Sequence, residues 1–377
     1  MENRRMLKNH NKKSNEPINR PLHFLKIFFS GIFILCFFVG LSVYLIDPFY
    51  HYHKPWFGLK AVLTDKEYQC IGTLYHFDYD ALLVGSSVVE NNNNSWYDDA
   101  YHCTTIKAVR SYGATADLCY LLDAAYESHS LKQVFYNIDP SSLSADPVPT
   151  FQSTGCPMYL YDQNPLNDVQ YLFNKDVLLK KIPYLLVQSF FSDYDENESY
   201  NWAQWKSFNQ ASALGLYFRP RTTQKMLPQN AYQTQLSGNI ALLTAQVAAH
   251  PQTQFHFFFP AYSMLWWDGI YRTGERDAYI YNEKQVVKAL LAYDNVTIYC
   301  FQNTPDIITN LDNYLDSIHF SPAINKWMLD QMVQGHDRLT IENYEEKLDG
   351  MQNFSDQIVN QLIKPYEEQN LLTYEIQ

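Results

Sequence analysis

An uncharged run of twenty residues near the N-terminus, IFFSGIFILCFFVGLSVYLI at positions 27–46, constrains this chain more than any other feature. At about 1.5 Å per residue, a helix of this length spans the roughly 30 Å hydrocarbon core of a bilayer. The alternatives are a buried core helix and a cleaved signal peptide. A signal peptide has a shorter apolar region and a small-residue cleavage site, which the following LIDPF does not offer. We therefore expect an uncleaved transmembrane signal anchor at 27–46.

The charges on either side of this run predict its orientation. Residues 1–26 form a tail with two acidic and seven basic residues, the latter being Arg4, Arg5, Lys8, Lys12, Lys13, Arg20 and Lys26. The positive-inside rule places this tail in the cytoplasm and the rest of the chain outside, as a single-pass membrane protein. The chain has 28 basic and 40 acidic residues, so the part after the tail keeps 21 and 38, a formal net charge of −17. Such a charge disfavours nucleic acid as a partner.

The remaining chain reads as a juxtamembrane segment at 47–77, a large domain at 78–335 and a helical extension at 336–377. Six cysteines occur, at positions 36, 70, 103, 119, 156 and 300, and the five outside the apolar run contain no CxxC pair. This pattern indicates neither a disulfide framework nor a zinc site. His51 and His53 alternate as metal ligands can, but a site normally needs three or four ligands. We expect no metal and no cofactor.

From Tyr79 onward, strand-like and helix-like segments alternate. Short apolar runs in ALLVGS, TTIKAVRSYGA, KQVFYNIDP, QFHFFFPAY and NVTIYCFQN predict strands, and TADLCYLLDAAYESH and NEKQVVKALLAY have helical periods. This alternation predicts βαβ units and a parallel sheet covered on both faces. Residues 141–235 break the rhythm and are rich in Tyr, Asn, Asp and Trp, so we expect an insertion beside the sheet. Its aromatic side chains could stack on sugar rings or form the insertion's own core.

Three residues far apart in the sequence suggest acyl-transfer chemistry. Ser87 follows the first predicted strand. Asp316 and His319 follow the last predicted strand and are three residues apart, so on a helical turn they face the same way. A carboxylate can then fix the imidazole tautomer while the other ring nitrogen points at a serine. Each residue alone also has a structural explanation, in which Asp316 caps a turn and His319 packs in the core.

Here the sequence resembles a family. G-x-S after the first strand, a glycine after the second and D-x-x-H before the last helix resemble the landmarks of SGNH (GDSL-like) hydrolases, over roughly residues 78–335. The stretches DPFYHYHKPW, HFDYDALLVGSSVVEN and DSIHFSPAINKWM are similar, more narrowly, to a membrane-anchored group from bacterial cell-envelope and polysaccharide loci. The resemblance implies an α/β three-layer sandwich with a five-stranded parallel sheet of flavodoxin-like type. It also implies a catalytic triad of Ser87, His319 and Asp316.

The resemblance further implies an oxyanion hole. The N–H groups of Ser87 and Gly113 match two of its donors. The third donor, an asparagine side chain in the family, is where this sequence departs. Asn137 lies near the required strand end without the G-x-N-D pattern, and Asn91 is a substitute. Ser86 stands where the family has aspartate.

Two functions follow from these features. The first is a serine acyl-esterase or O-acyltransferase that acts on a cell-envelope glycan through an acyl-serine intermediate, for example in O-acetylation, with a membrane acyl-donor protein as a partner if it transfers. The second is a catalytically inactive SGNH-like protein that binds glycan or scaffolds envelope polysaccharide assembly. The completeness of the oxyanion hole discriminates between them.

Overall fold

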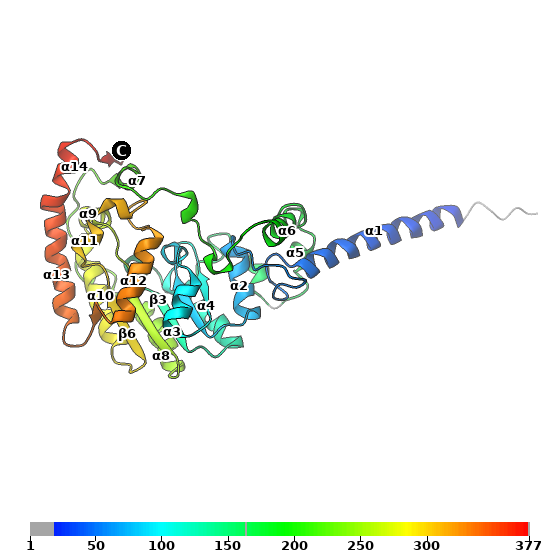
Figure 1. Ribbon diagram of the computed structural model, residues 1–377, viewed down its shortest axis with the longest axis horizontal. Coiled ribbons are helices and arrows are strands. Elements are labelled where there is room, and N and C mark those ends of the chain that lie inside the picture. The colour runs from blue at the N-terminus through cyan, green and yellow to red at the C-terminus, as the bar shows by residue number, and fades with distance from the viewer. Residues whose placement is uncertain (1–18, 163, 376–377) are drawn as a thin grey trace, which may run out of the picture.

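A long apolar helix extends from a compact α/β body (Figure 1). The computed structural model describes residues 19–162 and 164–375, so most of the predicted basic tail lies outside the described residues. Helix α1 (Asn19–Ile46) contains one stretch that is long and apolar enough to cross a membrane. Every side chain from residue 21 to residue 38 is exposed. The described part of the chain therefore leaves this stretch of α1 uncovered.

The body is built on a mostly parallel sheet. Its strands are buried apolar runs, as expected for strands covered on both faces. Five of them pair in parallel, in the order β2 (Thr105–Val109), β1 (Ala81–Gly85), β3 (Gln133–Asn137), β5 (Gln254–Phe259) and β6 (Val296–Cys300). In chain order this is the 2-1-3-4-5 arrangement of flavodoxin-like folds.

The expected five-stranded sheet is wrong in one respect, because a sixth strand is present. Strand β7 (Arg338–Leu339) pairs with β6 in antiparallel fashion. It belongs to the segment predicted to be a helical extension. Two residues are too few to show a hydrophobic period, so the sequence gives no sign of this strand.

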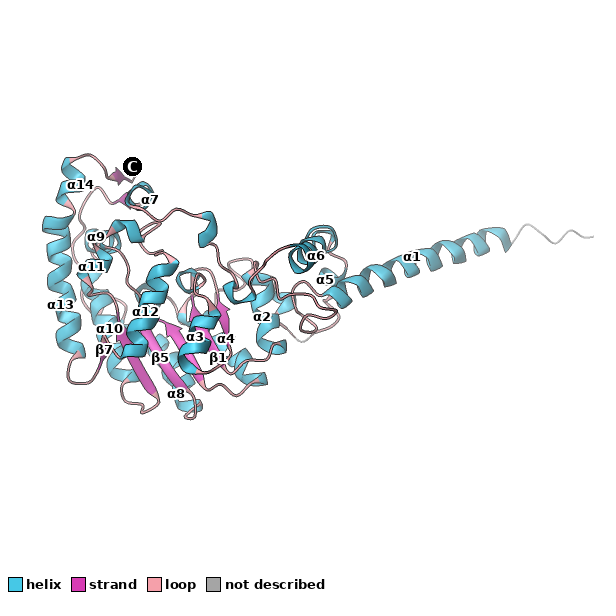
Figure 2. Ribbon diagram, viewed as in Figure 1, coloured by secondary structure: helices cyan, strands magenta, loops and turns pink. Residues whose placement is uncertain are grey.

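Helices connect the strands and cover the sheet. Right-handed crossovers place the connection from β1 to β2 on one face and those from β2 to β3, β3 to β5 and β5 to β6 on the other. The contacts agree, since α4, α8 and α10 touch in series and α12 touches α3. Figure 2 shows α3 and α12 in front of the strands. The helices of the body outside the segment between β3 and α8 are α2 (Lys66–His76), α3 (Asn94–Tyr101), α4 (Thr115–Ser128), α8 (Gln233–Ala249), α9 (Met264–Arg272), α10 (Arg276–Leu290), α11 (Pro305–Ile308), α12 (Pro322–Gln334), α13 (Tyr344–Gln357) and α14 (Lys364–Glu368).

The segment between β3 and α8 adds no strand to the large sheet in its described residues. It contains α5 (Val169–Leu172), α6 (Ile182–Phe191), α7 (Gln210–Gly215) and the short β4 (Phe218–Arg219). Strand β4 pairs with β8 (Thr373–Tyr374) near the C-terminus. The insertion is thus tied to the end of the chain as well as to the sheet.

The juxtamembrane segment is folded into the body rather than extended. Asp47, which follows α1 directly, is fully buried and accepts hydrogen bonds from the Tyr171 hydroxyl at 2.7 Å and from the Tyr52 N–H at 2.7 Å. Burial raises the pKa of Asp47, while these bonds oppose the rise. The Tyr171 hydroxyl also accepts from the Phe49 N–H at 3.1 Å. The root of α1 is therefore bonded to the insertion.

Candidate active site

The first predicted strand ends in a glycine because two side chains fill the space beside it. A Cβ at Gly85 would lie 2.9 Å from the Cβ of Asn137, closer than real Cβ atoms approach, and 3.0 Å from the methyl groups of Val89, which is a tight contact. A short 3₁₀ turn (Ser87–Val89) then begins at Ser87. This point lies at the carboxyl end of β1, where the chain connections leave in opposite directions, which is the usual ligand position in such sheets.

Asp316 and His319 lie on a tight loop, not on the expected helical turn. The loop is closed by a bridge between Tyr314 and Phe320, and the Leu315 N–H donates to the His319 carbonyl at 2.9 Å. One oxygen of Asp316 accepts the His319 N–H at 2.8 Å. An aspartate bonded to its own loop in this way makes a turn, and this local bonding replaces a helical hydrogen bond. The two side chains still face the same way.

The structure brings Ser87, His319 and Asp316 into one hydrogen-bonded row. Ser87 Oγ lies 2.8 Å from His319 Nε2, and His319 Nδ1 lies 2.7 Å from Asp316 Oδ2. Because the carboxylate faces Nδ1, the proton sits on Nδ1 and Nε2 is free to accept the serine proton. Burial raises the pKa of Asp316, but the hydrogen bond to His319 and the charge of His319 lower it by more. The pKa of Asp316 is therefore below its usual value. The arrangement can activate a serine hydroxyl.

A cavity of about 340 Å³ opens in front of this row. Ser87 and His319 line it, together with Gly113 and the buried pair Asp139 and Tyr262. The Tyr262 hydroxyl donates to the Asp139 carboxylate. Burial raises the pKa of Asp139, although its hydrogen bonds to Ser86 and Tyr262 act in the opposite direction. The cavity is small and lined by hydroxyl groups, a size and chemistry that suit a small acyl group.

The backbone supplies part of an oxyanion hole. Ser87 is the first residue of its 3₁₀ turn, so its N–H has no acceptor within the turn. Gly113 lines the cavity as expected, but its N–H donates to the Arg110 carbonyl at 3.2 Å. One of the two expected backbone donors is thus already engaged in this conformation.

The two asparagines proposed as the third donor do not line the cavity. Asn137 ends β3 and is buried beside Gly85, and its amide atoms have no hydrogen-bond partner among the described residues. The Asn91 side-chain oxygen accepts from the N–H groups of Trp202 and Ala203, at 3.1 Å each. Asn91 therefore holds the insertion against the turn that carries the serine.

Trp202 belongs to the site and was not predicted from the sequence. Its indole N–H donates to the Ser87 carbonyl at 3.3 Å. Its ring meets the His319 ring edge-on, with centroids 5.2 Å apart and planes at 90°. The only signal was the aromatic richness of the insertion, because no spacing rule links residue 202 to residues 87 and 319.

A larger groove of about 890 Å³ lies on the insertion side, and Trp202 is one of its walls. Aromatic and acidic side chains dominate its lining, namely Tyr184, Tyr194, Tyr200, Trp202, Trp205, Asp65, Glu67, Glu90, Asp193, Asp195 and Glu198. Some of the insertion's aromatic residues pack in its own core, and others are free to stack on a sugar ring. Tyr200 is buried, whereas Trp205 is 78% exposed.

The two juxtamembrane histidines have structural partners. His51 Nε2 lies 3.1 Å from Asp168, and the two ring nitrogens of His53 each lie 2.7 Å from a carbonyl oxygen, of Lys54 and of Tyr44. In the described residues, no three histidine, cysteine or acidic side chains are grouped to hold a metal ion. All six cysteines are free thiols.

Comparison with known proteins adds nothing to this geometry. No family model matches the chain, and no curated protein matches it. The function is therefore argued from the arrangement of the side chains.

Proposed function

We propose that the chain is a membrane-anchored serine acyl-esterase or O-acyltransferase that acts on a cell-envelope glycan. The observation that carries the proposal is the row of Ser87, His319 and Asp316, joined at 2.8 and 2.7 Å at the edge of a small cavity. A serine hydroxyl is a weak nucleophile until a base takes its proton, and this row supplies the base and the acid that orients it.

The proposed reaction has two steps. Ser87 Oγ attacks the carbonyl carbon of the acyl ester while His319 Nε2 takes the hydroxyl proton, and the carbonyl oxygen becomes an oxyanion near the Ser87 N–H. The ester C–O bond then breaks, and His319 returns the proton to the departing alcohol oxygen. In the second step, water or a sugar hydroxyl attacks the acyl-serine and gives its proton to His319. The acyl group leaves as a free acid or as a new ester, and Ser87 is restored.

The groove beside the site supports a glycan as the substrate. Aromatic faces and carboxylate oxygens are the groups that pack on sugar rings and accept bonds from their hydroxyls. The five aromatic and six acidic residues of the groove supply both, and Trp202 joins the groove to His319. The surplus of acids disfavours a polyanionic polymer there. A neutral glycan carrying a small acyl ester fits this lining.

We also propose where the protein lies in the cell. Helix α1 would be a single-pass anchor with its basic N-terminal side in the cytoplasm and the α/β body outside. The body would then meet its glycan at the outer surface of the membrane. A transferase of this kind needs an acyl donor, and a membrane protein that delivers the acyl group is the partner we propose.

The engaged Gly113 N–H supports a second candidate. An oxyanion hole with one free backbone donor gives weaker stabilisation of a tetrahedral intermediate. In this case the chain would bind or scaffold an envelope glycan without turning it over. The groove would serve the same ligand in both functions.

Covalent labelling separates the two candidates. The purified full chain should react with a fluorophosphonate and hydrolyse an aryl acetate. Ser87→Ala should abolish both, because it removes the attacking oxygen. His319→Ala should slow labelling by about 10²-fold or more, since it removes the base. Asp316→Ala should cost less than His319→Ala, because a serine–histidine pair retains activity without its orienting acid.

Ser86→Ala is the matched control. Ser86 precedes the nucleophile and lines the same cavity, so its loss should leave labelling largely intact. Labelling that survives Ser87→Ala but disappears in Ser86→Ala would show that Ser86, not Ser87, carries the reactive hydroxyl. A folded wild-type chain that is never labelled yet binds an envelope glycan would establish the second candidate.

A further inference from the structure

Helix α6 carries an exposed apolar face. Its sequence, IPYLLVQSFF, contains no charge. Ile182, Leu185 and Ser189 point into the body. The opposite side exposes a set of large apolar side chains that we call the α6 surface: Leu179 from the preceding turn, Val187, Phe190 and Phe191, which are 50 to 84% exposed. A monomeric soluble domain rarely leaves such side chains together in water, so this face needs a cover.

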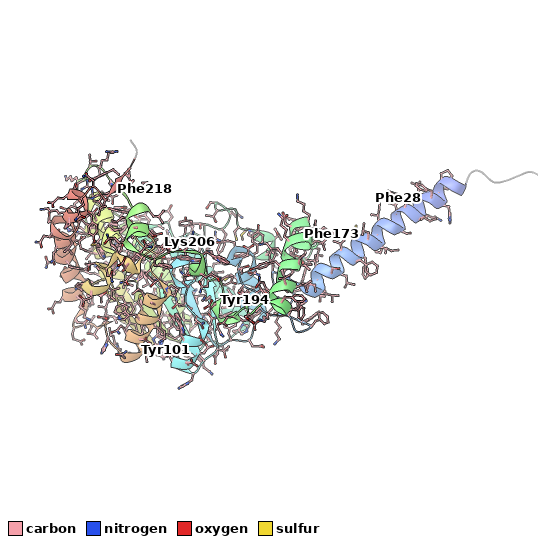
Figure 3. The ribbon with its side chains drawn as sticks, turned by 45° about the horizontal axis from the view of Figure 1, so that its top comes forward. Phe28, Tyr101, Phe173, Tyr194, Lys206 and Phe218 are labelled. Carbon is pink, nitrogen blue, oxygen red and sulfur yellow. The ribbon has the colours of Figure 1, made fainter. Side chains whose placement is uncertain are left out.

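The α6 surface is adjacent to the root of α1. Helix α1 contacts α5 and the turn that precedes α6. Phe173, between α5 and that turn, touches α1 directly, since a Cβ at Gly40 would lie 3.6 Å from its ring. In Figure 3 the helix beside the Phe173 label runs across the end of α1. An orientation across a transmembrane helix is parallel to the membrane plane.

The length of α1 fixes the depth of this contact. Gly40 is six residues before Ile46, so it lies about 9 Å inside the end of the helix. The uncharged run, residues 27–46, covers about 30 Å, which matches a bilayer core. A hydrocarbon layer that covers this run ends near Ile46, so Gly40 lies below its outer edge. Phe173 and the helices beside it therefore lie at the depth of the outer leaflet, within the roughly 5–10 Å to which interfacial helices are buried.

The charges nearby favour lipid over protein as the cover. Lys175, Lys180 and Lys181 lie within seven residues of sequence, in a part of the chain whose net charge is otherwise strongly negative. Lys175 is exposed, Lys180 is exposed and paired with Asp176 at 2.8 Å, and Lys181 is half-buried and paired with Asp65 at 2.7 Å. Lys175 and Lys180 are therefore the basic side chains that can reach the headgroups. Basic side chains next to an exposed apolar helix face are typical of elements that lie in the membrane interface, where they meet anionic headgroups.

We propose that the α6 surface is embedded in the outer leaflet beside α1, as a second point of attachment to the lipid. The inference rests on the proposed role of α1 as a membrane anchor. Tyr184 and Gln188 of the same helix line the aromatic groove. The groove therefore lies at the lipid surface, and the ester it receives belongs to a glycan that is held close to the membrane.

Site-directed fluorescence tests this in the full chain. The partly or fully exposed cysteines (Cys36, Cys103 and Cys156) are replaced by alanine, and Val187→Cys or Phe191→Cys then carries an environment-sensitive probe. The chain is reconstituted in phosphatidylcholine–phosphatidylglycerol vesicles with a doxyl lipid as quencher. Both probes should be quenched several-fold more than a probe at Ile341→Cys. Ile341 is a matched control, because it is apolar, 60% exposed and next to α13, at the end of the body opposite α1 (Figure 1).

A second variant keeps the native Cys36, which is exposed on α1, and lacks only Cys103 and Cys156. A probe on Cys36 in this variant separates failure of the inference from failure of the anchor. Quenching at Cys36 but not at residues 187 and 191 would overturn the α6 proposal and leave the anchor intact. Absence of quenching at Cys36 would overturn both.

Two further outcomes test what covers the α6 surface. Probes at 187 and 191 that are shielded from aqueous iodide but not quenched by doxyl lipid would indicate a protein cover, such as a second copy, and would contradict the proposal. The double substitution Val187→Asp and Phe190→Asp should reduce quenching of a probe at 191 while the Cys36 probe stays quenched. Unchanged quenching at 191 would show that these side chains do not lie in lipid.

Discussion

Trp202 is one of the residues that link the serine turn to the insertion. Its indole N–H reaches the Ser87 carbonyl, and its ring edge meets His319. A contact of this kind does not touch the reacting bond, so Trp202 acts by positioning. It limits the rotation of the imidazole and fixes the start of the turn that carries Ser87, the proposed nucleophile.

Substitution of Trp202 should separate these two effects. Trp202→Phe keeps an aromatic ring beside His319 and removes the N–H bond, which is worth about 0.5–1.5 kcal/mol. Labelling by a fluorophosphonate should slow by roughly two- to tenfold. Trp202→Ala removes both contacts and should slow it more. Trp205→Phe is the matched control, because Trp205 is largely exposed in the same groove and its indole has no hydrogen-bond partner among the described residues. Equal rates for Trp202→Phe and Trp205→Phe would contradict the positioning role.

The residues of the site differ in how far the sequence could predict them. Ser87, His319 and Asp316 follow strands whose carboxyl ends share one edge, so their proximity follows from the topology. Trp202 comes from an irregular segment whose path depends on tertiary contacts, and no local pattern encodes that path. The engagement of the Gly113 N–H depends on the Arg110 carbonyl, a backbone contact that side-chain identity does not reveal.

Strand β2 contributes a buried lysine that joins three elements. Lys107 is 1% exposed, and its ammonium group donates to the carbonyls of Glu90, Asn92 and Ser199, at 2.7, 2.6 and 2.5 Å. Three carbonyls match the three donors of an ammonium group. Two of them follow the serine turn, and the third lies three residues before Trp202. This lysine therefore connects the sheet to both parts of the site.

Lys107→Met should lower the free energy of unfolding by about 3 kcal/mol, because it leaves three buried carbonyls without a donor. Chemical denaturation monitored by circular dichroism measures the loss. Lys132→Met is the control: it removes an exposed lysine paired with Asp80, and a pair of this kind contributes little. Similar losses for the two variants would contradict the structural role of Lys107.

The difference in free energy of unfolding between the wild type and Lys107→Met should depend on pH. Burial lowers the pKa of Lys107 to about 7, below the value of about 10.4 in an unfolded chain. Between these values the unfolded chain binds more protons, so the free energy of unfolding of the wild type should rise with pH relative to Lys107→Met. A stability difference that stays constant from pH 7 to about pH 9.5 would contradict this.

At the scale of elements, long apolar runs were predictable and short contacts were not. The five parallel strands and the helices between them follow from short runs rich in apolar residues and from helical periods. Strands β7, β4 and β8 have two residues each, and they form only because tertiary packing brings their partners close. The loop of Asp316 and His319 was expected to be helical, because a spacing of three also suits a helix.

At the scale of the whole molecule, the anchor, the groove and the serine lie in sequence away from the proposed membrane. Helix α1 meets the insertion at Phe173, α6 lines the groove, and Trp202 joins the groove to the serine site. Helix α14, near the end of the described chain, lies on the body, away from α1 (Figure 1). In this order the groove lies between the proposed membrane surface and the serine site, and Trp202 separates the groove from Ser87.

This arrangement has its proposed function only if the body lies outside the cytoplasm. Seven basic residues precede the apolar run, and positive charges are retained on the cytoplasmic side. A phosphatase that is active only outside the membrane should therefore be active when fused after the last residue. The same phosphatase fused before the first residue should be inactive and is the matched control. Activity of the N-terminal fusion alone would reverse the orientation and would remove envelope glycans from the substrates that this site can reach.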